Sequence, residues 1–468
     1  MKIKQFFLMA VVGLMAASLT SCNHDLSDHF GVSDNPTTGV TEVTVDLSGI
    51  ADQYLNDEKT QLKLAVGDQV TLSFNIQPAE FADTEVTLTP EDNEIVSIDG
   101  LKVKALKVGT TTVKAQAGSK TCVVTVVVVN PLATPLTIEA TTAGTINIAN
   151  SQAITIKYSK DGGVTKTESS ATSIAIEVAA GDKVQLYGTT ATGSGSSIGK
   201  CVKITGSGDG FKCTVYGNIM SLLSETGFDE NTTLPAISTF RALFKGNTTL
   251  TDASKLLLPA TTLTNACYEN MFCGCTALTA APELPATEGM SSGTCYSSMF
   301  EGCSSLTEAP SELPATTLGS NCYVAMFKDC ISLTAAPQLK ATTLADYCYQ
   351  SMFQGCTSLA TAPELPVETL KKDCYEAMFQ GCTSLTTAPE LPAPTLVEAC
   401  YSTMFQGCTN LSSVTCLATS GFGESYCLNS WLYGVSSTGT FTKVDGITSW
   451  VTGSDGIPSG WTVNTVTP

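Results

Sequence analysis

The sequence predicts a multidomain protein: an all-β sandwich, a second β domain, and then an α/β solenoid of about eight repeated units. Residues 41–130 and 131–230 alternate apolar and polar residues in short runs that turn residues interrupt. This is the pattern of half-buried strands. The second half repeats one nine-residue pattern at a nearly fixed interval, which is typical of a solenoid. A chain of 468 residues is long enough for about three domains.

The first residues have the layout of an export signal. Two lysines precede an apolar run, 6–14, and small residues follow it, as in a secretory signal peptide. Residues 19–22, Leu-Thr-Ser-Cys, resemble the lipobox of bacterial lipoproteins. In that family the cysteine, here Cys22, is lipidated and becomes the first residue of the mature chain. The resemblance implies a signal peptide of residues 1–22 and a membrane partner reached through a lipid anchor. The alternative is an ordinary signal peptide with a chance cysteine.

Residues 23–40 are polar and rich in turn formers, so we expect a flexible tether. The tether carries His24 and His29, the only histidines of the chain. Ser-His-Asp and Cys-His nucleophile systems both need an imidazole base, and histidine-containing zinc sites need one as a ligand. We therefore expect neither an enzyme nor a cofactor.

The charge of the chain argues against a nucleic-acid partner. The formal net charge is −19, and Arg241 is the only arginine. A phosphate backbone requires a basic face, and bidentate phosphate recognition relies on arginine. No apolar stretch after the signal is long enough to span a bilayer. An exported chain also lives where disulfides can form.

Residues 41–130 are predicted to form a β-sandwich, because several short strands with no helical stretch fill them. Three segments, 64–72, 94–115 and 122–128, follow the order of motifs in the bacterial immunoglobulin-like group 2 domain, which this region resembles. The tryptophan common in the middle strand of that family is absent here. The resemblance implies a stalk.

Residues 131–230 again alternate in the manner of strands, and we expect a β domain that caps the repeats. Cys201 and Cys213 lie symmetrically about a glycine-rich turn at 206–208. We predict that they face each other across a hairpin, with a disulfide between them as a hypothesis.

The region 231–435 repeats the pattern seen in "CYEAMFQGC", residues 374–382. Six copies with two cysteines eight residues apart recur every 26 to 28 residues. A degenerate copy without either cysteine, "TFRALFKGN", precedes them, and "CLNSWLYGV" follows. Apolar residues at i, i+1, i+4 and i+5 predict a short helix in each copy, and the glycine is expected to end it. Residues 436–468 are expected to form a C-terminal cap.

The repeats resemble the BspA-type leucine-rich repeat proteins on the surface of anaerobic gut and oral bacteria. Six "CYxxMFxGC" motifs, connectors of the "LTxAPELPATTL" type and the ending 439–463 carry the resemblance. It implies a lipid-anchored outer-membrane protein, exposed at the cell surface, with a non-enzymatic binding or adhesion function. The implied partner is a protein or glycan outside the cell.

The repeated cysteines allow four interpretations. Zinc thiolate sites use cysteines two to four residues apart, and a catalytic thiol needs a base, so metal and catalysis are disfavoured. Inward-facing columns of thiols and cross-links within each copy both stay open. Joint loss of both cysteines in the first copy favours cross-links. The candidate disulfides are Cys201–Cys213, Cys267–Cys275, Cys295–Cys303, Cys322–Cys330, Cys348–Cys356, Cys374–Cys382, Cys400–Cys408 and Cys416–Cys427.

The variable positions between the copies are the candidate binding surface, represented by Thr361, Glu364, Thr387 and Glu390. A column of carboxylates beside "LP" could bind Ca²⁺ or form a plain solvated edge, and the solvated edge is preferred. An alternative function is a glycan-binding accessory lipoprotein of a polysaccharide uptake system. It would need exposed aromatic residues, and the three tryptophans (Trp431, Trp450 and Trp461) all lie in the last unit.

Overall fold

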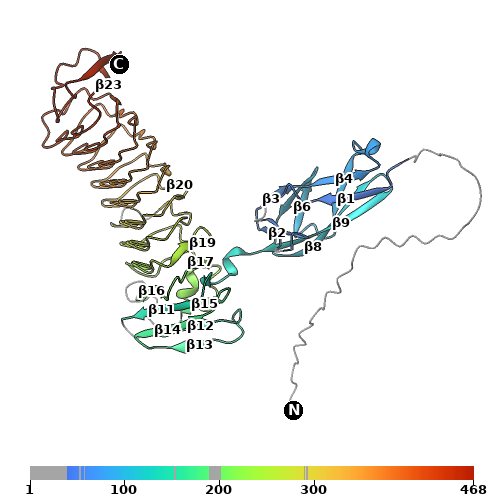
Figure 1. Ribbon diagram of the computed structural model, residues 1–468. Helices are drawn as coiled ribbons and strands as arrows, with labels where there is room; N and C mark the ends of the chain where they lie inside the picture. Colours follow the sequence, from blue (N-terminus) through green and yellow to red (C-terminus); the bar gives the residue numbers. More distant parts are fainter. Residues whose placement is uncertain are drawn as a thin grey trace, which may run out of the picture. The chain divides into compact units, whose positions relative to one another are not determined.

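The computed structural model describes residues 39–51, 54–56, 58–151, 154–188, 202–288, 290 and 293–467. Figure 1 shows the chain coloured from the N-terminus to the C-terminus. The expected signal peptide and Cys22, and the expected tether up to residue 38, lie outside the described residues, as does Cys201. The chain divides into two compact units, Met1–Val128 and Val129–Pro468.

The first unit is built from antiparallel sheets that share an apolar core. One sheet has the order β2 (Leu62–Ala65), β9 (Lys120–Val129), β8 (Gly109–Ala117) and β5 (Val86–Pro90). A second has the order β3 (Gln69–Thr71), β7 (Lys102–Ala105) and β6 (Val96–Asp99). A pair, β1 (Glu42–Asp46) and β4 (Ser73–Gln77), and a short 3₁₀ turn, η2 (Ala79–Phe81), complete the unit.

The core of the first unit follows from alternation along its strands. In β8 the side chains of Val113, Ala115 and Ala117 are buried, and the residues between them are more exposed. In β9 the same alternation buries Val124 and Val126. Successive side chains of a strand point to opposite faces, so each strand gives one face to the core. Cys122 lies on β9 and is half-buried.

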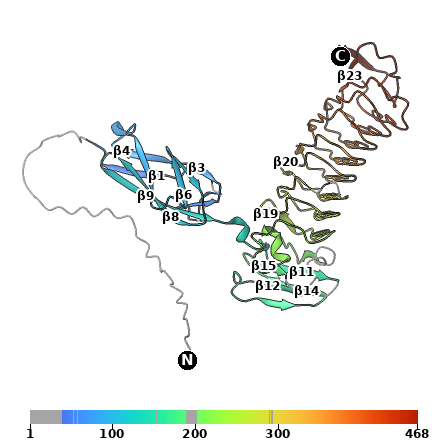
Figure 2. The same ribbon diagram turned by 180° about the vertical axis from the view of Figure 1, so that it is seen from behind.

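The second unit begins with two sheets packed over one core (Figure 2). The larger sheet has the order β13 (Thr167–Ser169), β12 (Ile156–Ser159), β15 (Lys183–Gly188), β10 (Thr137–Ala140), β17 (Cys213–Asn218) and β18 (Leu250–Asp252), with β19 (Leu256–Leu257) also paired to β17. The smaller has the order β14 (Ser173–Val178), β11 (Gly144–Asn150) and β16 (Val202–Ser207). Two 3₁₀ turns, η3 (Pro131–Ala133) and η4 (Ile219–Leu222), flank these strands.

The second β domain is continuous with the first coil of the repeats. Strand β17 pairs in parallel with β18 and β19, which belong to that coil. The Ile204 N–H also donates to the Leu243 carbonyl, N to O 2.6 Å. The buried residues of both regions form one apolar cluster. The end of the coil stack is therefore covered by the β domain.

The repeats form stacked coils with little regular structure of their own. Strand segments are short: β20 (Glu312–Leu313), β21 (Gln338–Leu339) and β22 (Ser413–Cys416). Two longer strands, β23 (Gly439–Val444) and β24 (Trp461–Val466), continue from β22 in a parallel sheet at the C-terminal end. Isolated parallel bridges connect successive coils, for example Ala335 to Thr361 and Thr387 to Ser413.

The prediction of an α/β leucine-rich-repeat-like solenoid is wrong, because no α-helix occurs in the described residues. In the "CYEAMFQGC" copy every second backbone N–H donates its hydrogen bond to the next coil. The Ala377, Phe379 and Gly381 N–H groups donate to carbonyls of the next coil at 2.8 to 2.9 Å. The N–H groups between them donate within the coil to the carbonyl three residues earlier. Ala377 accordingly has a φ of 53° and Gly381 one of 75°, outside the α-helical region.

The interior of the coils consists of columns of identical side chains. Six tyrosines from Tyr268 to Tyr401 stack with ring centroids 5.5 to 6.1 Å apart. Seven phenylalanines from Phe244 to Phe405 stack at 5.3 to 5.7 Å. Offset stacking at such distances adds about 0.5–1.5 kcal/mol per pair beyond the buried area. The Met-Phe pairs therefore belong to the core.

Candidate functional site

The second cysteine of each motif forms a column of buried thiols along the coils. The Cys382 thiol donates to the Phe353 carbonyl of the preceding coil, with Sγ to O 3.1 Å. The other five copies repeat this contact at 3.0 to 3.1 Å: Cys275 with Phe244, Cys303 with Phe272, Cys330 with Phe300, Cys356 with Phe327, and Cys408 with Phe379. The column thus ties each coil to its neighbour.

The first cysteine of each motif forms a separate column with different partners. The Cys295 thiol donates to the Thr264 carbonyl at 3.2 Å. The Cys322 thiol donates to the Gly293 carbonyl at 3.0 Å. A hydrogen bond between the Cys295 and Cys322 thiols, together with burial, raises the pKa of Cys295. These contacts again run between coils.

All the described cysteines are free thiols, and most are buried. The structure therefore places the cysteines of the six motif pairs, from Cys267–Cys275 to Cys400–Cys408, in two separate columns without joining them. The seventh pair is not joined either: Cys416 lies on β22, and the Cys427 thiol faces the Phe422 carbonyl. Cys213, the described member of the eighth pair, lies 3.7 Å from the Thr249 hydroxyl, Sγ to Oγ1. Column packing was the alternative that the sequence left open, and the disulfides stay a prediction for chemical analysis.

Burial raises the pKa of most of the repeated thiols, whereas a hydrogen bond with Cys295 lowers the pKa of Cys322. Desolvation raises the pKa of Cys275, Cys356, Cys408 and Cys416 to about 12. The thiolate is the nucleophile and the metal ligand, and it is scarce at neutral pH when the pKa is that high. Within the described ranges, no group of three or more His, Cys, Asp or Glu side chains is placed to hold a metal ion.

A groove runs along the repeats at the connectors of three successive coils, residues 337–340, 363–366 and 389–392. We call it the Pro–Glu groove. One cavity of about 520 Å³ is lined by Ala362–Pro366, Pro389, Glu390 and Pro392. A second, of about 460 Å³, is lined by Ala336–Lys340 and Ala362–Glu364. The two cavities share Ala362, Pro363 and Glu364, so they lie side by side along the coils, and the name covers both.

The predicted binding residues divide between the groove and its flank. Glu364 and Glu390 are exposed and line the groove. Thr361 and Thr387 are exposed too, but they form bridges between coils and do not line either cavity. The sequence therefore located the carboxylates of this surface, whereas the prolines that shape it were treated only as strand stops.

A second pocket of about 400 Å³ lies at the C-terminal end of the coils. We call it the cap pocket. Its lining includes Phe422, Glu424, Tyr426, Trp450 and Asp455. Tyr426 is 70% exposed, in contrast to the buried tyrosines of the column. The sequence analysis assigned these residues only to the last copy and the cap, because their meeting depends on how 447–457 folds over the last coil.

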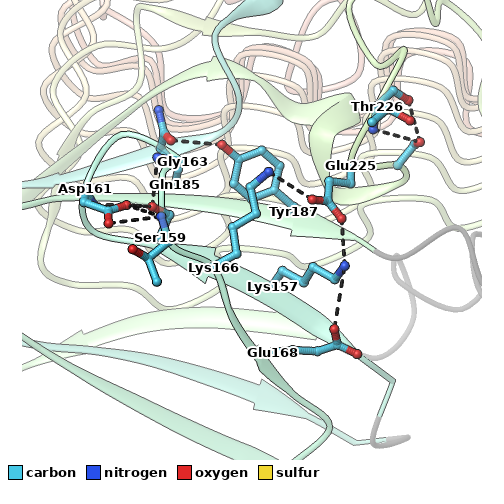
Figure 3. Close-up of polar contacts among 12 residues, drawn as sticks. Lys157, Ser159, Asp161, Gly163, Lys166, Glu168, Gln185, Tyr187, Glu225 and Thr226 are labelled. Atoms are coloured by element: carbon cyan, nitrogen blue, oxygen red, sulfur yellow. Dashed lines mark hydrogen bonds and ion pairs between the residues drawn. The ribbon is translucent and has the colours of Figure 1, made fainter. Parts of the chain in front are cut away.

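A polar cluster occupies the second β domain (Figure 3). Lys157 and Lys166 both form ion pairs with Glu225, with Nζ to Oε distances of 2.8 and 2.9 Å. The Lys166 ammonium also lies 4.6 Å from the centre of the Tyr187 ring. The hydrogen bonds from both lysines lower the pKa of Glu225.

Nearby, hydrogen bonds from Ser159 and Thr165 lower the pKa of Asp161 to about 2. Asp161 belongs to the turn at Gly162 and Gly163. An open cavity of about 450 Å³ adjoins the cluster and includes Lys166, Tyr187 and Glu225 in its lining. Glu168 also pairs with Lys157, with Nζ to Oε2 3.6 Å, so two carboxylates balance the two ammonium groups. We therefore interpret the cluster as a structural link between β12, β13 and the segment after η4.

No protein-family model matches the chain, and a search of curated proteins finds no relative. In the part of the chain that the structure describes, no helix has the length and apolar character needed to cross a membrane.

Proposed function

We propose that the chain is an exported, lipid-anchored protein of the outer membrane that binds a protein or glycan ligand outside the cell without converting it. The binding surface is the Pro–Glu groove. The observation that carries the proposal is that two adjacent cavities, which share Pro363 and Glu364, extend this groove over the connectors of three coils. A groove that repeats with the coils suits an extended ligand.

The chemistry of the groove supports binding rather than catalysis. Its lining consists of prolines and small apolar residues with exposed Glu364, Glu390 and Lys340. Prolines keep a rigid surface without backbone donors, which lowers the entropy lost when a ligand binds. Glu364 and Glu390 occupy equivalent positions in adjacent coils, so the two carboxylates have similar surroundings. Glycoside hydrolysis requires two carboxyl groups with different protonation states.

The experiment compares the wild-type protein with Glu364→Lys/Glu390→Lys on a panel of extracellular matrix proteins and a glycan array. We expect at least one specific ligand whose binding falls more than tenfold in the double variant. Glu80→Lys/Glu85→Lys is the matched control, because it makes the same charge change at exposed positions of the first unit. Ligand binding that both double variants weaken equally would indicate a general charge effect and contradict the proposal.

The location has its own test. A Cys22→Ser variant is expected to leave the membrane fraction, and protease treatment of intact cells is expected to remove the repeats. Full protection of the repeats in intact cells would favour an orientation toward the periplasm.

The alternative function is a glycan-binding accessory lipoprotein of a polysaccharide uptake system. Glycan binding that persists in Glu364→Lys/Glu390→Lys would favour this alternative.

A further inference from the structure

The segment from Trp450 to Gly456 contacts the last coil in the way that a following coil contacts the coil before it. The Trp450 ring stacks on Trp431, with centroids 5.9 Å apart and planes at 24°, and so continues the aromatic column. The Gly456 carbonyl accepts from the Trp431 indole N–H at 2.9 Å. The Asp455 carboxylate accepts from the Ser430 N–H at 2.7 Å. In the preceding coil, the equivalent N–H of Thr403 donates to a carbonyl of the following coil.

The cap pocket lies beside this segment, which contributes Trp450 and Asp455 to its lining. Two carboxylates, Glu424 and Asp455, line the pocket together with Phe422, Tyr426 and Trp450. Asp455 uses Oδ1 for the Ser430 N–H and the Ser454 hydroxyl. Glu424 is exposed, and its carboxylate has no hydrogen bond or ion pair to any described residue. Both side chains therefore retain accepting capacity toward the pocket.

No basic side chain balances these carboxylates. Lys443 is the only lysine or arginine after Lys372 in the sequence. It does not line the pocket, and its ammonium donates to the Ile447 carbonyl at 2.6 Å. No lysine or arginine thus lines the cap pocket, and a cation is the ligand that would balance its carboxylates.

We propose that the cap pocket binds the ammonium or guanidinium group of a ligand, as carried by a lysine or arginine side chain. Carboxylates form charge-assisted hydrogen bonds with such groups. An exposed tyrosine ring attracts them by a cation–π interaction of about 0.5–1 kcal/mol. Tyr426 supplies the exposed ring, and Glu424 and Asp455 supply the acceptors. This site is separate from the Pro–Glu groove and does not depend on the function proposed for the groove.

Trp450 is not free to stack on a sugar, which leaves Tyr426 as the exposed ring of the pocket and makes a neutral sugar the ligand to compare with a cation. Stacking of a sugar needs an open aromatic face, whereas the Trp450 ring contacts Trp431, Phe422 and Phe441 at 4.9 to 5.9 Å between centroids. Its indole N–H is buried and has no hydrogen-bond partner among the described residues. The tryptophans of the cap are packing residues, and the exposed groups of the pocket are Tyr426 and the two carboxylates.

Titration followed by tryptophan fluorescence and NMR of the full chain tests the proposal. The probes are N-acetyl-lysine methylamide, N-acetyl-arginine methylamide and n-butylammonium, with N-acetyl-norleucine methylamide and methyl glucoside as neutral comparisons. We expect the cations to bind in the millimolar range, at least tenfold more tightly than the neutral probes, and more weakly as salt is raised. Equal binding of butylammonium and the lysine derivative would show that a free amine suffices. Tighter binding of the amino-acid derivatives would show that the backbone contributes.

Variants locate the site. Glu424→Gln and Tyr426→Ala should each weaken binding of the lysine derivative at least threefold, and the double variant at least tenfold. Asp445→Asn removes an exposed carboxylate of the cap that does not line the pocket and should leave binding unchanged. The proposal would be overturned if the norleucine derivative or methyl glucoside bound more tightly than the cations. It would also be overturned if Asp445→Asn weakened cation binding as much as Glu424→Gln. The groove variant Glu364→Lys/Glu390→Lys should keep cation binding, so the two sites can fail separately.

Discussion

The first unit and the coils satisfy their backbone hydrogen bonds in different directions. In the first unit, β8 and β9 pair antiparallel through a short turn, and each strand bonds to both sides within its sheet. In the coils, every second N–H group of a copy donates to a carbonyl about one repeat later in the chain. The sandwich is thus held by pairing between strands of different sequence, and the coils by pairing between copies of one sequence. Where neighbours are copies, a change at one position is felt mainly by the coils on either side.

Removing a ring from an aromatic column should have the largest effect. Phe379 is fully buried between Phe353 and Phe405, so Phe379→Ala should lower the unfolding free energy of the second unit by about 3–5 kcal/mol. Leu64 is fully buried in the first unit. Leu64→Ala should cost about 2–5 kcal/mol there. Denaturant unfolding followed by hydrogen exchange assigns each loss to its unit. A shift of both units by either variant would show that the cores are not independent.

Burial of unpaired hydroxyls distinguishes the coils from the β domain. Among the described residues, the Tyr296 hydroxyl is buried without a hydrogen-bond partner, whereas the Tyr187 hydroxyl donates to Gln185 at 2.9 Å. An unpaired buried polar group costs about 1–3 kcal/mol. Tyr296→Phe should therefore stabilise the second unit by about 1 kcal/mol, and Tyr187→Phe should destabilise it by a similar amount. Equal destabilisation by the two variants in thermal melts would show that Tyr296 has a partner in solution.

The smallest effect concerns the ion pairs and has a defined pH range. Because the lysines lower the pKa of Glu225 in the folded state, their contribution is present above the ordinary glutamate pKa of about 4.3 and is lost as the pH falls below it. The Glu225 side chain is 28% exposed, so we expect less than about 1 kcal/mol. Glu225→Gln should flatten the decline in stability between about pH 5 and 3. Glu94→Gln breaks the more exposed pair with Lys107 and should change nothing measurable.

The contrast also explains what the sequence could predict. The alternation in "KTCVVTVVVV" corresponds to one structure, a strand with one buried face, and β9 forms there. The spacing of Tyr375, Met378 and Phe379 fits both a helix and a series of tight turns. The choice between them depends on N–H groups that bond to the next coil, which is information about neighbours and not about residue types. The left-handed backbone conformation at Ala377 could not be predicted from the residue type, because alanine does not favour this conformation.

The same distinction applies to the candidate sites. Glu364 and Glu390 were found because they repeat with the connectors, and repetition places them on one edge. Lys157 and Glu225 are 68 residues apart and follow no pattern, so only the fold brings them together. The cap pocket likewise depends on the return of 447–457 over the last coil.

Mass spectrometry of alkylated thiols is the most direct test of the central claim, that the repeated cysteines pack between coils and leave recognition to the surface. The protein is unfolded in guanidinium chloride without reductant, treated with iodoacetamide, and digested. The account predicts that all twelve cysteines of the six motifs, from Cys267 to Cys408 with Cys273 excluded, carry the alkyl group before any reduction. In the native protein the same twelve should react far more slowly than half-buried Cys122, because they are fully buried and the reagent cannot reach them. Alkylation of the twelve only after reduction would contradict the account and show that each pair is cross-linked.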